Sequence, residues 1–322
     1  MTLTVIHGRT AKLRGQFEDA FRTVPDTPAM QELKFSEMTI GQNADLQDDP
    51  TINSAALLDK RDEMDSSADA SGKHILDFND IGWWLKLLCG APVTTGTGPY
   101  THVFTVTLDQ RLSAMLEFVI GATGSEKFSQ FLGMSLNELG WNVMDGDQSF
   151  TTGLIGAVEV KPFPTAVFDV AAAARYPKSR SCTKRGNIYD VLNASTLGGI
   201  TKASIAITND MSGDPLANGE EGFGVILLGQ PAITGTLEAL YTQEASVYDA
   251  ALTGVTKKLV LVNANAAGTH SLTATFPTVE FDRPKREVKT TKGLKVSLNW
   301  RAYQEPGGDL PTFTVINAVD SY

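Results

Sequence analysis

The chain has 322 residues, a hydrophobic fraction of 42% and a formal net charge of −10, which is enough apolar material for one or two ordinary globular cores. No apolar run is long enough for a membrane helix, and the segment MTLTVIHGRTAKLRGQF is too polar for a secretory signal. The two cysteines, Cys89 and Cys182, are far apart in sequence, which excludes a disulfide framework and favours reduced, structural thiols.

The chain begins with a mixed segment and continues into an alternating one. Residues 11–22 favour a short helix that Pro25 and Pro28 would end. We therefore expect residues 1–30 to form an N-terminal arm, which either packs on a neighbouring subunit or frays. Residues 33–40 predict a half-buried strand with a bulge. In the acidic stretch 41–70 we expect two strand ends joined by a long solvated loop.

The chain is organised around residues 71–90, SGKHILDFNDIGWWLKLLCG. A glycine opens a short strand at 73–78, Asn79 is placed to cap a helix, and Gly90 takes the position after a helix end. Apolar residues recur at helical spacing and in a second stripe, so we expect this helix to be covered on more than one side. Trp83, Trp84 and Leu88 are the predicted packing anchors.

Short β-prone runs follow at close intervals. The predicted strands are 102–107, 113–120, 127–132, 133–139, 140–144 and 149–155, and Asp145-Gly146 predicts a hairpin turn before the last of them. Many short strands separated by turn residues predict a mainly β fold, an antiparallel sandwich or barrel.

The second half of the chain repeats the order of the first. Residues 161–198 lack a sustained period and are the predicted connector; strands are then expected at 200–207, 223–228, 258–262, 271–281 and 293–303. The unit at 234–254 has a strand-opening Gly235, a capping Thr242 and a closing Gly254, with a glycine spacing of 254 − 235 = 19 against 90 − 72 = 18 in the first unit. We interpret this order as a diverged duplication, with domains at 31–160 and 199–305 and a C-terminal tail at 306–322. Tyr248 is the packing anchor of the second helix.

No arrangement of residues predicts catalysis, a cofactor or a metal site. The histidines at 7, 74, 102 and 270 stand singly, without metal-ligand spacing, and each is interpreted as a strand or surface residue. The glycine-rich runs lack phosphate-loop spacing, there is no GxSxG elbow, and the acidic stretch lacks the central glycine of a calcium loop. An acidic chain also argues against binding nucleic acid through phosphate contacts. We therefore expect a protein that is not an enzyme.

One long stretch has the order of elements of a known family. The run ADASGKHILDFNDIGWWLKLLCGAPVTTGTGPYTHVFTVT, followed by LSAMLEFVIGATGSEKFSQFLGMSLNELGWNV, resembles the tail tube proteins of tailed bacteriophages. The resemblance is direct over residues 33–156 and extends to the second half because that half repeats the order of the first. The sequence differs from the family at 112–114, where the family often has a proline. It implies two tandem tail-tube-type β-sandwich or barrel domains, each with one short flanking α-helix, in rings that stack into a tube for the genome.

The resemblance also implies partners and sites. Six domains per ring are usual in the family, so a trimer with pseudo-sixfold symmetry is favoured and a hexamer is the alternative. Tape measure and terminator proteins are further expected partners, DNA passes without specific binding during genome ejection, and no membrane is involved. The protein is expected in the virion tail after assembly in the host cytoplasm.

Two charged groups become candidate sites under this resemblance. Acids at the lumen or the ring junction would repel DNA, and a basic cluster would contact the adjacent ring. The acids are Asp45, Asp48, Asp49, Asp62, Asp65, Asp210, Asp214 and Glu220; the bases are Arg175, Lys178, Arg180, Lys184 and Arg185. Two alternatives stay open: another phage tail ring protein, such as a terminator or baseplate hub, and a carbohydrate-binding β-sandwich that uses exposed tryptophans.

Overall fold

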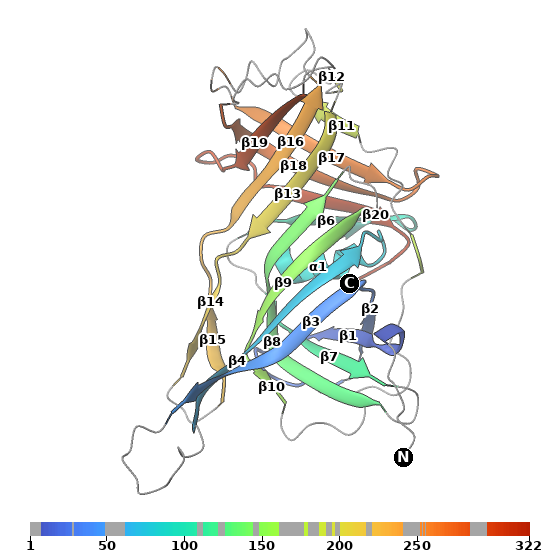
Figure 1. Ribbon diagram of the computed structural model, residues 1–322. Coiled ribbons are helices and arrows are strands. Elements are labelled where there is room, and N and C mark those ends of the chain that lie inside the picture. The colour runs from blue at the N-terminus through green and yellow to red at the C-terminus, as the bar shows by residue number, and fades with distance from the viewer. Residues whose placement is uncertain are drawn as a thin grey trace, which may run out of the picture.

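The computed structural model describes residues 8–27, 29–48, 62–107, 112–121, 126–143, 148–160, 177–179, 187–190, 195–196, 200–216, 221–240, 252, 254, 256–283 and 295–322. Within these residues the chain is mainly β, with antiparallel strand pairs and one α-helix. Figure 1 shows most of the first half, in blue to green, below most of the second half, in yellow to red.

One sheet, called the long sheet below, runs through both halves of the chain. Each pair of neighbouring strands in it is antiparallel. In spatial order its strands are β3 (Glu37–Gln47), β4 (Asp62–Ile75), β9 (Ser149–Gly156), the second half of β8 (Lys127–Asn142), β13 (Ile200–Thr208), β16 (Ala232–Leu240), β19 (Lys295–Ala302) and the end of β18 (Ser271–Phe281).

Two smaller sheets cover one face of the long sheet. The first contains β2 (Gln31–Leu33), β1 (Lys12–Phe17), β7 (Ala114–Ile120), the first half of β8 and β10 (Val158–Glu159). The second contains β12 (Ser195–Thr196), β11 (Asn187–Asp190), β17 (Lys257–Ala264), the first half of β18, β20 (Thr312–Asn317), β6 (Tyr100–Thr105) and β5 (Val93–Thr95). Outside them lie η1 (Gly8–Thr10) and the hairpin of β14 (Ser212–Pro215) and β15 (Phe223–Leu227).

Strand β8 bends at Gly133 and so passes from one layer to the other. Gly133 has a φ of 68°, and a Cβ there would meet Ala157 and Phe21 at 2.8 Å, so the bend requires glycine. The Gly133 N–H donates a hydrogen bond of 2.8 Å to the buried carboxylate of Glu18, which also accepts one from the Ser113 hydroxyl. The carboxylate of Glu18 therefore connects the bend at Gly133 to the end of β1.

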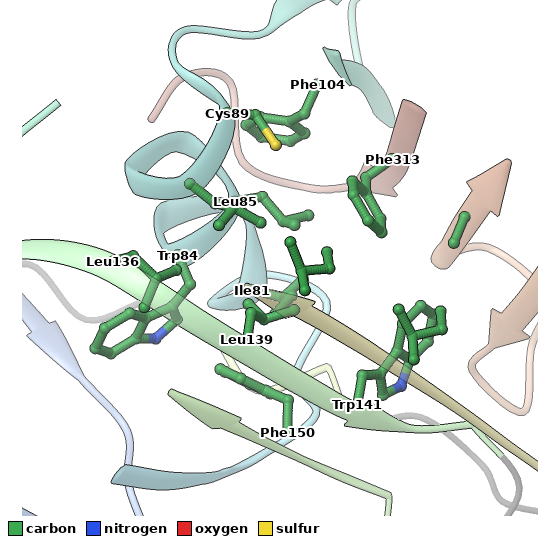
Figure 2. Close-up of a cluster of buried hydrophobic side chains, with 14 of the residues drawn as sticks. Ile81, Trp84, Leu85, Cys89, Phe104, Leu136, Leu139, Trp141, Phe150 and Phe313 are labelled. Carbon is green, nitrogen blue, oxygen red and sulfur yellow. The ribbon is translucent and has the colours of Figure 1, made fainter. Parts of the chain in front are cut away.

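Helix α1 (Ile81–Cys89) fills the space between the layers. All its residues except Lys86 are buried, and Gly90, with a φ of 89°, ends it. Figure 2 shows Ile81 and Trp84 gathered with Leu136, Leu139 and Phe150 of β8 and β9. These side chains belong to one hydrophobic cluster that extends from Leu13 in the first half to Val315 near the C-terminus. One continuous cluster therefore contains residues of both halves.

Seven strand pairings recur in the two halves in the same chain order. The recurring pairs are β1–β2 and β11–β12, β1–β7 and β11–β17, β3–β4 and β13–β16, β4–β9 and β16–β19, β7–β8 and β17–β18, β8–β9 and β18–β19, and β8–β10 and β18–β20. Two further pairings, β8–β13 and β6–β20, join one half to the other.

The predicted mainly β class, the helix after residue 79 and the strand at 271–281 are confirmed. The three short strands predicted over 127–144 form one strand, β8, because the glycines at 133 and 140 bend and pack the strand without ending it. The helix cap is Asp80 in place of Asn79, whose side-chain oxygen instead accepts a hydrogen bond from the Ala318 N–H.

The prediction of a short helix at 11–22 is wrong. Residues 12–17 form β1 because β2 and β7 pair with its two edges, and such tertiary pairing overrides a weak helix pattern. Residues 306–322, set apart as a tail, supply β20, which lies between β18 and β6. The helix expected after Thr242 falls at 241–251 and 253, outside the described residues.

Candidate functional surface: an open sheet face and an open sheet edge

One face of the long sheet packs on the core, and the other, called the open face below, carries mostly small or polar side chains, with the exposed Ile75 at the end of β4 as an exception. Burial alternates along its strands, as on β9, where Phe150 and Thr152 are buried and Thr151 is exposed. One row across the open face runs through Thr39, Ser71, Gly153, Glu138 and Thr208. No large apolar side chain lies in this row.

A shallow hollow of about 550 Å³ lies in the open face between β3 and β13. It exists because Gly140, Gly153 and Ala206, at its floor, have little or no side chain. Glu37, Lys73 and other polar side chains edge it. Its position across five strands makes it a feature of the sheet surface.

Acids slightly outnumber bases among the described side chains of the open face. Glu238 of β16 is paired with Lys295 of β19 at 2.6 Å, and this hydrogen bond is the main cause that lowers the pKa of the Glu238 carboxyl. The acids on this face are Glu37, Asp69, Glu138, Glu238 and Glu280, and the bases are Lys73, Lys202, Lys295 and Arg301.

Strand β3 forms one end of the long sheet. It pairs with β4 along eleven residues, and no strand in the described part of the chain pairs with its outer edge. An open edge of this length presents a row of backbone N–H and C=O groups and pairs readily with another chain unless it is blocked. β3 has no proline or lysine to block such pairing. Among the described residues, the outer edge of β3 is therefore open to pairing with another strand.

The predicted acids gather at the ends of two hairpins. Asp45 and Asp65 lie opposite each other near the end of the β3–β4 pair, Asp62 lies opposite Gln47, and Asp48 is exposed just beyond β3. Asp210 and Asp214 are exposed before and on β14. Asp49 and Glu220 lie outside the described residues.

The two acidic stretches meet in space, which the sequence does not predict. Glu221, two residues before β15, accepts hydrogen bonds from Gln42 of β3 at 2.6 Å and Ser66 of β4 at 3.3 Å. The Arg22 side chain donates to the Glu221 carbonyl at 2.8 Å, which anchors the same hairpin to the N-terminal strand region. In Figure 1 the β14–β15 hairpin accordingly runs down beside β4. One acidic edge thus forms from both halves.

A comparison with known protein families matches residues 8–302 to the family described as phage tail tube protein. The chain belongs to the phage tail tube protein family. Its role is accordingly that of a structural component of a phage tail tube in the virion. No curated protein sequence matches the chain.

In this tail tube protein the predicted packing anchors of the first helix are interior residues. Trp83 and Trp84 are in edge contact, with ring centroids 4.9 Å apart, and Leu88 is buried beside them. Trp83 also packs on Phe17 of β1. The second apolar stripe of the helix is therefore covered by the chain itself. Tyr248 lies outside the described residues.

Of the predicted basic cluster, the structure describes Lys178, which is exposed. Its neighbour Ser179 donates its N–H to the Asp77 carboxylate at 3.1 Å, and Asp77 is also bonded to Lys34 at 2.9 Å. Residues 177–179 are thus held against the start of α1, on the side of the long sheet opposite the open face. Arg175, Arg180, Lys184 and Arg185 lie outside the described residues.

Two histidines expected as strand or surface residues are fully buried. His74 lies between Trp84 and Phe150, and burial lowers its pKa to about 4. His102 is bonded to Thr94 and to the Val319 carbonyl, each at 2.8 Å. Within the described residues no three His, Cys, Asp or Glu side chains cluster as metal ligands, and no helix there is long and apolar enough to cross a membrane.

Proposed function

We propose that three copies of this chain close into a ring with pseudo-sixfold symmetry and that such rings stack into a tube that conducts the phage genome. The observation that carries the proposal is the recurring strand order, in which one half of the chain meets the other through β8 and β13. A junction that joins two unlike edges can be repeated from copy to copy until a ring closes. A ring of six copies is the alternative.

In this proposal each chain carries two tandem tube domains that arose by duplication, at 31–160 and 199–305. The seven recurring pairings support it, and they extend the two domains at their ends. β1 in the segment 1–30 corresponds to β11 in the connector, and β20 in the segment 306–322 corresponds to β10. The N-terminal and C-terminal segments would therefore belong to the domains, because each contributes a strand to a sheet.

Ring closure would also cover the open outer edge of β3. An eleven-residue strand with an open outer edge is an aggregation hazard in a free subunit, and pairing that edge with a neighbouring copy satisfies its backbone groups. The repeated use of one junction then abolishes every edge of the long sheet, as in a closed barrel. The exposed face of that barrel would be the open face described above.

The open face suits a channel wall for DNA. Its side chains are mostly small or polar and its acids outnumber its bases, so it offers phosphates no basic track to bind. Acids at the hairpin ends, Asp45, Asp48, Asp49, Asp62, Asp65, Asp210, Asp214 and Glu220, would line the rim or the junction between stacked rings and repel the duplex. The basic cluster, including the exposed Lys178, would contact the adjacent ring from the outer side. Tape measure and terminator proteins would be the partners at the tube ends, after assembly in the host cytoplasm.

Negative-stain electron microscopy of the purified protein tests this function. Long hollow tubes are expected, and rotational averaging of end views distinguishes three chains from six. Rings that never stack would favour a terminator or baseplate ring, and persistent monomers at high concentration would contradict the proposal. Replacing Asp48, Asp49, Asp62 and Asp65 by lysine should leave tubes intact if these acids face the channel, whereas loss of tubes would assign them to an interface.

A further inference from the structure

We propose that the end of β18 in one copy of the chain pairs with β3 of a second copy in one defined register. That register is the one in which β8 already pairs with β13 inside the chain. The inference rests on the proposed ring and specifies how its subunits meet.

The internal junction supplies the template. In the antiparallel pair of β8 and β13, Leu139 lies opposite Ile207, and Gly140 lies opposite Ala206. Leu139 and Ile207 face the core and are 2% and 1% exposed, whereas Gly140 and Ala206 lie on the open face. The register therefore matches core residues with core residues across the junction.

Gly72 in β4 and Gly235 in β16 show which residues of the first half correspond to which residues of the second half. A Cβ on Gly72 would approach the His74 ring nitrogen to 2.7 Å, and a Cβ on Gly235 would approach the Ser204 carbonyl oxygen to 2.1 Å. Both positions therefore require glycine on the core side of the sheet. The row through Gly72 contains Met38, Gly72, Thr152 and Leu139. The row through Gly235 contains Ile205, Gly235, Trp300 and Phe281.

These two rows show where a neighbouring strand is missing. Ile205 and Ile207 on β13 are both 1% exposed, because β8 covers that edge. Their counterparts Met38 and Ile40 on β3 also pack on the core but are only half-buried. The difference in burial marks the place that a strand equivalent to β8 would cover.

The end of β18 is the strand that fits this place. Phe281 corresponds to Leu139, and in the described part of the chain Glu280 and Phe281 pair with β19 on one side and with no strand on the other. Carrying the internal register across subunits gives three pairs. They are Glu280 opposite Gly41, Phe281 opposite Ile40, and Asp282 opposite Thr39.

This register is specified by burial. Phe281 and Ile40 would meet on the core side, as Leu139 and Ile207 do, and the exposed Asp282 and Thr39 would meet on the open face. A slip by one residue would turn Phe281 against an open-face residue of β3, so the hydrophobic pattern opposes it. Directly opposed Cα atoms are about 4.5–5.5 Å apart, within the span that a disulfide bridges.

Cysteine cross-linking of the full-length chain tests the register. The variant Thr39→Cys/Asp282→Cys should form covalent dimers and trimers on mild oxidation, at least tenfold more than Gly41→Cys/Asp282→Cys, which is two residues out of register. The Gly140→Cys/Ala206→Cys variant carries the equivalent internal pair and should close a disulfide within one chain. Each single-cysteine variant controls for cross-links through Cys89 or Cys182.

Electron microscopy of the same samples distinguishes failure of the proposed ring from failure of the proposed register. Absence of rings and tubes in the unaltered protein would overturn the proposed function. Tubes with equal or preferential cross-linking of the out-of-register variant would overturn the register alone. Should the cysteine variants fail to assemble, hydrogen exchange on the unaltered protein decides: backbone amides at 38–41 should exchange at least tenfold more slowly in tubes, and unchanged exchange there would refute the pairing.

Discussion

The buried His74 should make the stability of the subunit fall as the pH is lowered. Its ring stacks on Phe150 at 4.8 Å and lies 4.6 Å from Trp84. Nδ1 faces the Lys34 carbonyl at 2.9 Å, and a carbonyl can only accept, so Nδ1 carries the proton. Nε2 then accepts from the Thr152 hydroxyl at 3.0 Å. These two hydrogen bonds therefore favour the neutral imidazole of His74.

The size of the effect follows from the pKa of His74. Burial lowers it from 6.5 to about 4, so the native state resists a proton that the unfolded state accepts. The stabilisation is thus complete above pH 6.5 and is lost as the pH falls toward 4. By linkage the loss is about 2 kcal/mol at pH 5 and about 3 kcal/mol at pH 4.

Urea unfolding of the unassembled subunit between pH 7 and pH 4.5 measures this loss. The matched variant is His74→Gln, whose amide has no titration in this range. The difference in unfolding free energy between the two proteins should shrink by about 2 kcal/mol from pH 7 to pH 5, or roughly 0.7 M in urea midpoint for a slope of about 3 kcal/mol/M. Parallel pH profiles for the two proteins would refute the assignment of this dependence to His74.

Three further predictions concern the core and the bend. Replacing Trp84 by alanine should lower the unfolding free energy by about 3–5 kcal/mol in urea titrations, whereas Val93→Ser, at an exposed edge, should change it by less than about 0.5 kcal/mol. Gly235→Val should abolish soluble folded protein in an expression assay, because its Cβ would meet backbone at 2.1 Å; Gly8→Ala, with no atom within 4 Å, should express normally. Burial raises the pKa of Glu18, so its contribution to stability grows as the pH falls through that pKa, and Glu18→Gln should remove this gain from the difference profile; an unchanged profile would contradict it.

The sequence by itself determined the local elements of this protein. Residues 81–89 form a helix because apolar side chains recur at helical spacing and Gly90 ends the run, and residues 271–281 form a strand because their burial alternates with period two. The same local signals place Gly72 and Gly235 at strand starts, whereas both lie inside longer strands, β4 and β16. Signals of this kind depend only on residues that are close together in the sequence.

Tertiary structure decided the elements and contacts that depend on distant partners. β1 is a strand because residues about 100 positions later pair with it, and β20 is a strand because β18 and β6 lie on either side. The contact of Glu221 with Gln42 and the burial of His74 likewise depend on strands far away in sequence. Local propensity is worth a fraction of a kcal/mol per residue, whereas pairing and burial act together across a sheet, so the distant partners fix the final structure.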